Sequence, residues 1–279
     1  MIGEHQVIHD VSLEIAQGDF VALLGGNGAG KTSLFRTIVG VLPPSKGKVE
    51  FKGEEISHLP AHKIVGKGIA LCPEGRQLFP QLSVYKNLML GAYHRKDKKG
   101  IEETLEQVFN LFPRLKERYK QMAGTFSGGE QQMLAVGRAI MSKPEMLLLD
   151  EPSNGLDPAG IVEVRELLLD MVKNKGVTVF ISSHILGEIS RMATRIGIIH
   201  DGKLILESGT EELDRMRHKK LVLDAIDKTG AVSILGNSGF AVNQTDEGTI
   251  ETTDERAVRH QGHRGGEEED RGGGFRVEP

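Results

Sequence analysis

The chain has few cysteines, few aromatic residues and no long apolar run. Its single cysteine, Cys72, excludes an internal disulfide and a zinc site built on cysteines, and it fits a reducing compartment. No apolar run approaches the roughly 18 residues that a membrane-spanning helix needs, and the first residues lack the pattern of a secretory signal. The sequence therefore predicts a protein that does not cross a membrane unaided.

The chain also lacks a surplus of charge of either sign. It has 35 lysines and arginines against 39 aspartates and glutamates, which leaves a formal net charge of -4. Such a balance provides no bulk attraction to nucleic acid or to anionic lipid. We therefore expect no nucleic-acid partner.

Glycine, by contrast, is abundant, at 35 residues, and the rest of the pattern is that of an α/β protein. Residues 83–142 follow a helical period, and helical patterns also separate the predicted strands. These strands are 11–15, 20–24, 48–52, 69–72, 146–149 and 177–182, with a hairpin over 196–207. This order predicts an α/β core over residues 1–209, interrupted by a helical insertion at about residues 77–142.

The pattern weakens beyond residue 209. We expect residues 210–260 to form a weakly defined extension. Residues 261–279 are rich in glycine and charge, and we expect them to be disordered because they cannot bury enough apolar surface.

A glycine-rich loop follows the strand predicted at 20–24 and precedes a predicted helix, and it has the spacing G-x-x-x-x-G-K-[ST]. Its residues are Gly25, Gly26, Asn27, Gly28, Ala29, Gly30, Lys31 and Thr32, followed by Ser33. The glycines let backbone N–H groups converge on phosphate oxygens, and the helix N-terminus adds partial positive charge. We expect Lys31 to neutralise the β- and γ-phosphates of a nucleotide and Thr32 to ligate Mg2+.

Two carboxylates end the buried strand predicted at 146–149. A strand that ends in acidic residues is ordinarily a strand meeting solvent, but in a P-loop protein the ends of two neighbouring strands meet at the phosphates. We therefore expect Asp150 to hold Mg2+ and Glu151 to act as the general base that takes a proton from the attacking water.

Three motifs in this order resemble the ATP-binding cassette (ABC) ATPase family. They are the glycine-rich loop, Ser127-Gly128-Gly129-Glu130-Gln131, and Leu147-Leu148-Leu149-Asp150-Glu151-Pro152. Asp157 and His184 extend the match, which covers about residues 7–209. The resemblance implies a P-loop NTPase core with RecA-like topology, an antiparallel β subdomain and a helical insertion. It also implies that the chain binds ATP with Mg2+ and hydrolyses it.

The same resemblance assigns roles to residues outside the glycine-rich loop. Asp157 would touch the site of a second copy, and His184 would lie near the γ-phosphate as a catalytic residue. A signature loop, which binds ATP held by the glycine-rich loop of a second copy, would consist of Ser127, Gly128, Gly129 and Glu130. The implied partners are transmembrane permease subunits and, when ATP is bound, a head-to-tail dimer with itself or with a paralogous ATPase subunit. The implied location is cytoplasmic, on the inner face of the cell membrane through the permease.

Two positions depart from the family pattern. The aromatic residue that usually stacks on adenine is Ile2 here, so we expect a shortened start and weaker, less adenine-selective nucleotide binding. The usual glutamine in the loop that joins the core to the insertion is Glu74, which we retain as a further candidate ligand of Mg2+.

Within the family the chain resembles two kinds of transporter ATPase. Residues 73–80, together with the helical stretch through 112–115, are similar to the ATP-binding subunits of branched-chain amino acid importers. Residues 155–158, 181–189 and 195–199 are more similar to bacitracin-type antibiotic exporter ATPases. We therefore expect an ATPase that powers branched-chain amino acid import, with drug or peptide-antibiotic export as the alternative.

Two further classes have less support. A soluble ABC ATPase acting on ribosomes or DNA would resemble two cassettes in one chain or carry a long coiled-coil insertion, whereas this chain has one cassette and no sustained heptads. A nucleotide-binding module that no longer hydrolyses ATP is the other class, and an assay of steady-state ATP hydrolysis separates it from the first interpretation.

Overall fold

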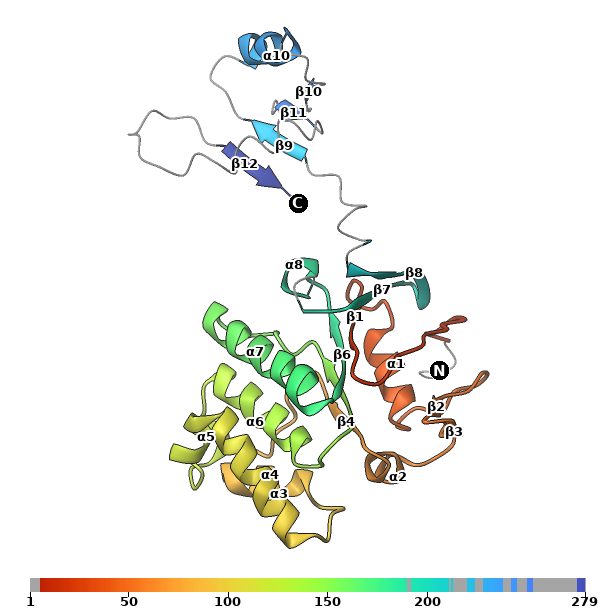
Figure 1. Ribbon diagram of the computed structural model, residues 1–279, viewed down its shortest axis with the longest axis vertical. Helices are drawn as coiled ribbons and strands as arrows, with labels where there is room; N and C mark the ends of the chain where they lie inside the picture. Colours follow the sequence, from red (N-terminus) through yellow and green to blue (C-terminus); the bar gives the residue numbers. More distant parts are fainter. Residues whose placement is uncertain are drawn as a thin grey trace. The chain divides into compact units, whose positions relative to one another are not determined.

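The computed structural model describes residues 6–189, 192–210, 212, 220–223, 228–237, 242–244, 250–252 and 275–278. The chain divides into two compact units, Met1–Thr210 and Glu211–Pro279, and each is described by itself (Figure 1). Ile2, with the expectations that depend on it, lies outside the described residues. All other residues to which the sequence assigns a role in nucleotide binding lie in the first unit.

A six-stranded sheet forms the centre of the first unit, in the order β4-β5-β6-β1-β7-β8. Its strands are β1 (Phe20–Leu24), β4 (Ile69–Cys72), β5 (Met146–Asp150), β6 (Thr178–Ser183), β7 (Arg195–His200) and β8 (Lys203–Gly209). The first five run parallel, and β8 returns antiparallel to β7. Every residue of β1, β5 and β6 is buried, as expected for parallel strands covered on both faces.

Strand β6 lies between β1 and β5 and pairs with both. The expectation that the ends of β1 and β5 are neighbours is therefore wrong. Ser182 of β6 is in register with Leu23 of β1 on one side and with Asp150 of β5 on the other. The end of β6 thus contributes Ser182, and His184 directly after the strand, to the edge of the sheet where the glycine-rich loop begins.

Helices of the first unit follow the strands or form the insertion. They are α1 (Lys31–Ile38), α2 (Ala61–Gly66), α3 (Val84–Gly91), α4 (Lys98–Leu111), α5 (Pro113–Glu117), the 3-10 helix η1 (Ala123–Thr125), α6 (Gly128–Ile140), α7 (Pro158–Lys175) and α8 (Leu186–Ile189). The helices from α3 to α6 make up the predicted helical insertion. None of the helices in the described ranges combines the length and the apolar character that a membrane span requires.

The two faces of the sheet are covered by different helices. In Figure 1, α1 lies on one side of the sheet and α6 and α7 lie on the other. On the α1 side, Phe35 packs against Phe180 of β6 with ring centroids 4.8 Å apart, in a core that also contains Leu23 and Leu148. This packing fixes α1, and with it the glycine-rich loop at its start, against the carboxyl ends of the parallel strands.

Two predicted strands differ in the structure. Residues 11–15 form no strand, although Val11, Leu13 and Ile15 alternate with exposed residues and pack on the core as predicted. Alternation reports burial on one face, but a strand also needs a partner, and none of the described strands pairs with this segment. Of the strand predicted at 48–52, only β2 (Glu50–Phe51) forms, and it pairs antiparallel with β3 (Glu54–Glu55).

The second unit contains a four-stranded antiparallel sheet in the order β10-β11-β9-β12. Its described elements are β9 (Lys220–Leu223), α10 (Lys228–Asn237), β10 (Asn243–Gln244), β11 (Ile250–Thr252) and β12 (Phe275–Glu278). Strand β12 lies within the segment for which the sequence predicts disorder, so that prediction does not hold for Phe275–Glu278. The rest of 261–279 lies outside the described residues, and there disorder stays a prediction.

Candidate functional site

The glycine-rich loop joins β1 to α1 and uses conformations that favour glycine. Gly28 has φ +80° and Gly30 has φ +109°, where a side chain would strain the backbone. A Cβ atom on Gly25 would lie 2.4 Å from the carbonyl oxygen of Ile199 in β7. The loop therefore depends on glycine both for its turns and for its close approach to β7.

The start of α1 offers donors to an anion. The amide N–H groups of Lys31, Thr32 and Ser33 make no hydrogen bond to any acceptor in the described part of the chain, and Gly30 provides no side-chain cap. Free amides at a helix N-terminus, with the partial positive charge of the helix dipole, form an anion-binding site.

Lys31 and Glu151 form a buried ion pair at this edge. Lys31 is 6% exposed and the Glu151 side chain 5%, and Lys31 Nζ lies 2.9 Å from Glu151 Oε1. The ammonium group also donates to the carbonyl oxygens of Gly25 (2.7 Å) and Gly26 (3.1 Å). Glu151 Oε2 lies 2.8 Å from His184 Nδ1, so this carboxylate bridges the lysine and the histidine.

Strand β6, which lies between β5 and β1, holds Asp150 and Glu151 in place through Ser182. Ser182 Oγ lies 2.7 Å from Asp150 Oδ1, and the Glu151 amide donates to the same Oγ at 2.9 Å. Glu151 has φ +49°, in the left-handed region that a residue other than glycine rarely adopts. The chain thus turns sharply directly after Asp150, which brings the Glu151 carboxylate to Lys31.

These residues fit a nucleotide with Mg2+. Glu151 Oε1 is buried and, apart from the Lys31 ammonium, has no hydrogen-bond partner among the described residues. Those residues contain no cluster of three or more His, Cys, Asp or Glu side chains able to hold a metal. Mg2+ usually binds through one or two protein oxygens together with substrate phosphates, rather than in a cage of side chains. Thr32 and Asp150 are suitable for that kind of site.

The predicted signature loop begins α6 with a complete capping box. Ser127 Oγ accepts from the Glu130 amide (3.3 Å), and Glu130 Oε2 accepts from the Ser127 amide (3.0 Å). Arg118 donates to Glu130 Oε1 at 3.0 Å. The amides of Gly128 and Gly129 have no acceptor in the described chain. No hydrogen bond or ion pair between described residues joins this loop to the glycine-rich loop.

Arg76 connects the signature loop to two other loops. Its guanidinium lies 3.4 Å from Gln131 Oε1 in α6, and 3.4 and 3.3 Å from the carbonyl oxygens of Asn154 and Gly155. Arg76 stands two residues after Glu74, which is exposed. Arg138 of α6 in turn donates to the carbonyl oxygens of Arg76 (3.0 Å) and Gln77 (2.8 Å), and burial lowers the pKa of the Arg138 guanidinium.

Two residues have plainly structural contacts. The Asp157 carboxylate accepts from the Gly160 amide at 3.0 Å and caps α7, so in this chain its side chain stabilises its own helix. Burial raises the pKa of the Cys72 thiol to about 12, which keeps it protonated and unreactive at neutral pH.

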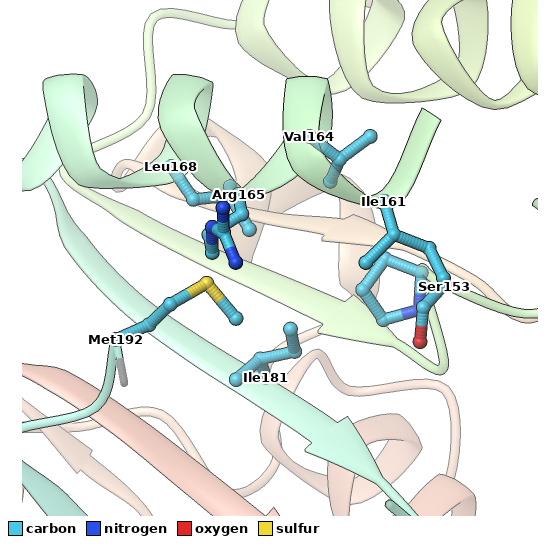
Figure 2. Close-up of a pocket in the computed structure, with 8 residues that line it drawn as sticks. Ser153, Ile161, Val164, Arg165, Leu168, Ile181 and Met192 are labelled. Carbon is cyan, nitrogen blue, oxygen red and sulfur yellow. The ribbon is translucent and has the colours of Figure 1, made fainter. Parts of the chain in front are cut away.

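A small cavity beneath α7 is lined in part by Pro152 and Ser153, which directly follow Glu151. It lies between α7 and β6 and is lined mainly by apolar side chains, including Val164, Leu168, Ile181 and Met192 (Figure 2). Its volume of about 20 Å³ is close to that of a single water molecule, so it cannot hold a nucleotide.

Sequence reasoning missed four residues that hold this region together: Ser182, Arg76, Arg138 and Asn87. Asn87 is fully buried in α3 and makes two hydrogen bonds of 3.0 Å to the backbone of Phe79. A polar residue within an apolar helical pattern is a signal that could have identified it. The roles of the others depend on which loops become neighbours, and no local pattern reports that.

Comparison with known proteins gives a consistent result. The family model described as ABC transporter matches residues 8–154. The high-affinity branched-chain amino acid transport ATP-binding protein BraG of Pseudomonas aeruginosa is 45% identical over 204 residues, which cover 73% of this chain and 87% of that protein. The bacitracin transport ATP-binding protein BcrA of Bacillus licheniformis is 36% identical over 239 residues, which cover 84% of this chain and 75% of that protein.

A solved structure supports the same assignment. The ADP conformation of MJ1267, an ATP-binding cassette of an ABC transporter, matches with a TM-score of 0.69 and 25% identity, covering 77% of this chain and 89% of that chain. The resemblance that the sequence motifs indicated is therefore confirmed. The chain belongs to the ABC transporter family, as an ATP-binding subunit that hydrolyses ATP.

Proposed function

We propose that this ATPase powers the import of branched-chain amino acids. The observation that carries the proposal is the 45% identity with BraG over 87% of that protein's length. The loop around Glu74, which joins the core to the helical insertion, supports it because this loop resembles that of importer ATPases.

In the proposed mechanism, the amides at the start of α1 bind the phosphates and Lys31 neutralises their charge. Thr32 and Asp150 would hold Mg2+, with Glu74 as a further candidate ligand, and the metal would supply positive charge beside the phosphate oxygens. Glu151 takes a proton from the attacking water at its carboxylate, and His184 orients that carboxylate through Oε2. The Lys31 ammonium exchanges its contacts with Gly25, Gly26 and Glu151 for phosphate oxygens.

The signature loop is proposed to act on a second copy. Gly128 and Gly129 present amides at the start of α6. The phosphates of a nucleotide bound to the same chain would be held by the glycine-rich loop at α1 instead. Two copies arranged head to tail satisfy both loops. Cassettes of this family form dimers and act with transmembrane subunits, which supports this arrangement.

A groove next to the loop that joins the core to the helical insertion is suited to bind the permease. It measures about 410 Å³, and Gln77, Phe79, Leu90 and Arg138 are among the residues that line it. Of these, Phe79 is 53% exposed and Leu90 is 40% exposed. Exposed aromatic side chains beside a groove are typical of a protein interface. Docking there would hold the ATPase at the inner face of the membrane.

Export is the second candidate function. The relation to BcrA extends over more of this chain, 84%, although the identity is lower at 36%. If this relation reflects the transported compound, the chain would drive the movement of a drug or a peptide antibiotic.

Copurification followed by transport tests the choice. A tagged chain with Glu151→Gln, which should retain its partners, is isolated from membranes of the source cells and its membrane partners are identified. We expect a pair of importer-type permeases, and vesicles containing the complex should take up leucine, isoleucine or valine when ATP is supplied. A single exporter-type membrane protein, with ATP-driven transport of bacitracin instead, would contradict the proposal.

A further inference from the structure

Ser182 occupies the point at which three strands of the sheet end together. It is fully buried on β6, the strand between β1 and β5, and is in register with Leu23 and Asp150. No motif in the sequence assigns a role to this residue. Its hydroxyl group contacts Asp150 and Glu151, the two carboxylate residues at the end of β5.

The direction of both hydrogen bonds follows from chemistry. The Glu151 amide can only donate, so Ser182 Oγ is the acceptor in the contact of 2.9 Å. The single hydroxyl hydrogen is then available to Asp150 Oδ1, 2.7 Å away, and an ionised carboxylate can only accept. One hydroxyl group therefore links the side chain of Asp150 to the backbone of Glu151.

Each bond fixes a different part of the site. The bond to Oδ1 sets the rotation of the Asp150 carboxylate, and Oδ2, which has no hydrogen bond to any described residue, is available to another ligand. The bond from the Glu151 amide supports a backbone with φ +49°, which is unfavourable for glutamate and must be held by its surroundings. That turn aims the Glu151 carboxylate at Lys31 and His184.

We propose that Ser182 is a positioning residue that sets, through one hydroxyl group, the orientation of the metal-binding carboxylate and the placement of the general base. This inference rests on the roles proposed above for Asp150 and Glu151. It adds that the geometry of both depends on the neighbouring strand β6, which does not contain either of them.

The neighbouring serine provides a matched control. Ser183 is also buried on β6, and its Oγ accepts from the Ile185 amide at 3.0 Å. Ser182→Ala and Ser183→Ala therefore each remove one buried hydroxyl group from the same strand. Ser182→Thr retains the hydroxyl group and serves as the second variant at the position of interest.

Three quantities are measured on the full chain. The first is the affinity for Mn2+, by electron paramagnetic resonance in the presence of a non-hydrolysable ATP analogue. The second is the rate of hydrogen exchange at the Glu151 amide, by nuclear magnetic resonance, and the third is kcat for ATP hydrolysis. Loss of a group that orients a metal ligand typically costs about 10-fold or more in metal affinity or activity.

For Ser182→Ala we expect Mn2+ affinity and kcat each to fall by about 10-fold and the Glu151 amide to exchange faster. Ser182→Thr should stay close to the parent protein, and Ser183→Ala should leave Mn2+ affinity and Glu151 exchange unchanged. The inference is overturned if the two alanine variants show the same Mn2+ affinity, whatever their melting temperatures.

Asp150→Asn, measured in parallel, separates this inference from the proposed function. If Asp150→Asn leaves the Mn2+ affinity unchanged, Asp150 is not the metal ligand, and the proposed site fails together with the inference. If Asp150→Asn weakens Mn2+ binding while Ser182→Ala does not, the proposed site stands and only the role of Ser182 is wrong.

Discussion

The two helices on which the proposed site depends, α1 and α6, begin in different ways. The start of α1 has no side-chain cap, and three consecutive amides there have no acceptor in the described structure, next to the buried ammonium of Lys31. The start of α6 has a complete capping box, in which Ser127 and Glu130 satisfy two of its amides. Among the described residues, the first helix therefore leaves three amides without an acceptor beside a buried cation, whereas the second leaves those of Gly128 and Gly129.

This difference indicates that the two loops have different roles in binding a nucleotide. The loop at α1 combines amides and a cation, so we expect it to bind a triphosphate within one chain. The loop at α6 contributes the two amides of Gly128 and Gly129 and no lysine, so we expect it to add to a site that another chain has already filled. The following substitutions test these roles.

The largest effect is expected when the loop at α1 loses its cation. Lys31→Ala should lower kcat/KM for ATP on the order of 10³-fold, because it removes charge-assisted hydrogen bonds worth about 1.5–3 kcal/mol each. Calorimetry of Mg-ATP binding and a hydrolysis assay measure the change. Arg36→Ala, which removes a cation from the exposed side of the same helix, is the control and should change neither. A decrease of less than 10-fold for Lys31→Ala would remove the basis of the comparison.

Glu151→Gln should separate binding by α1 from the chemical step. The substitution removes a base and keeps the shape of the side chain, so we expect kcat to fall by about 10²-fold while Mg-ATP affinity changes little. Glu145→Gln is the matched control, because Glu145 is an exposed carboxylate at the other end of β5. Hydrolysis of ATP by Glu151→Gln at the parent rate would show that another residue is the base.

The sequence predicted those parts of the site that are local in the chain. The strands at 20–24 and 69–72 form over these residues, and the start of α1 at Lys31 agrees with the prediction. Apolar runs, the spacing of glycines and the signals of a helix start predict these features, and each of these patterns is contained in a short segment of the chain.

The parts that sequence reasoning missed depend on contacts between distant segments. Ser182 meets Asp150 across 32 positions, and Arg76 meets Asn154 across 78. The first contact exists because β6 lies beside β5, and the second because β4, which precedes Arg76, lies on the other side of β5. Strand order cannot be read from hydrophobic patterns. Residues 11–15 show the same limit, since their alternation predicted partial burial correctly but could not supply a partner strand.

The loop at α6 can be tested by charge alone. Asparagine and aspartate are both good N-caps, so Ser127→Asn and Ser127→Asp should both preserve the start of α6. A carboxylate would repel the phosphates of a second chain, which costs several kcal/mol at an interface. In the Glu151→Gln background with ATP, we expect Ser127→Asp to weaken dimerisation on the order of 100-fold, and Ser127→Asn to retain it. Light scattering over a range of protein concentrations measures this.

Binding of Mg-ATP by monomeric protein separates the role of the loop at α1 from that of the loop at α6. Binding of Mg-ATP by monomers should be the same in both Ser127 variants, because the loop at α1 acts within one chain. Equal dimerisation by the two variants would mean that the α6 loop meets no anion, and a monomer at all concentrations for the Glu151→Gln parent would argue against the head-to-tail dimer itself.

The smallest effect is expected at Cys72, which lies where α6 covers the sheet. Its Sγ is 4.0 Å from Gln132 Nε2 of α6, and burial raises the pKa of the thiol from 9.0 to about 12. Above pH 9 the unfolded chain loses this proton while the folded chain keeps it, so stability falls as the pH rises from 9 towards 12. From pH 8 to pH 10 this titration should lower the free energy of unfolding by about 1 kcal/mol.

Urea unfolding of the parent protein and of Cys72→Ala at both pH values isolates this contribution. All other groups that titrate in this range are common to both proteins, and the cavity left by the missing sulfur is the same at each pH, so both cancel in the difference of differences. We expect the parent to lose about 1 kcal/mol more than Cys72→Ala between pH 8 and pH 10. Equal losses would mean that water reaches the thiol in the folded protein. In that case α6 would not stay closed over the end of β4, where Gln132 lies beside the thiol.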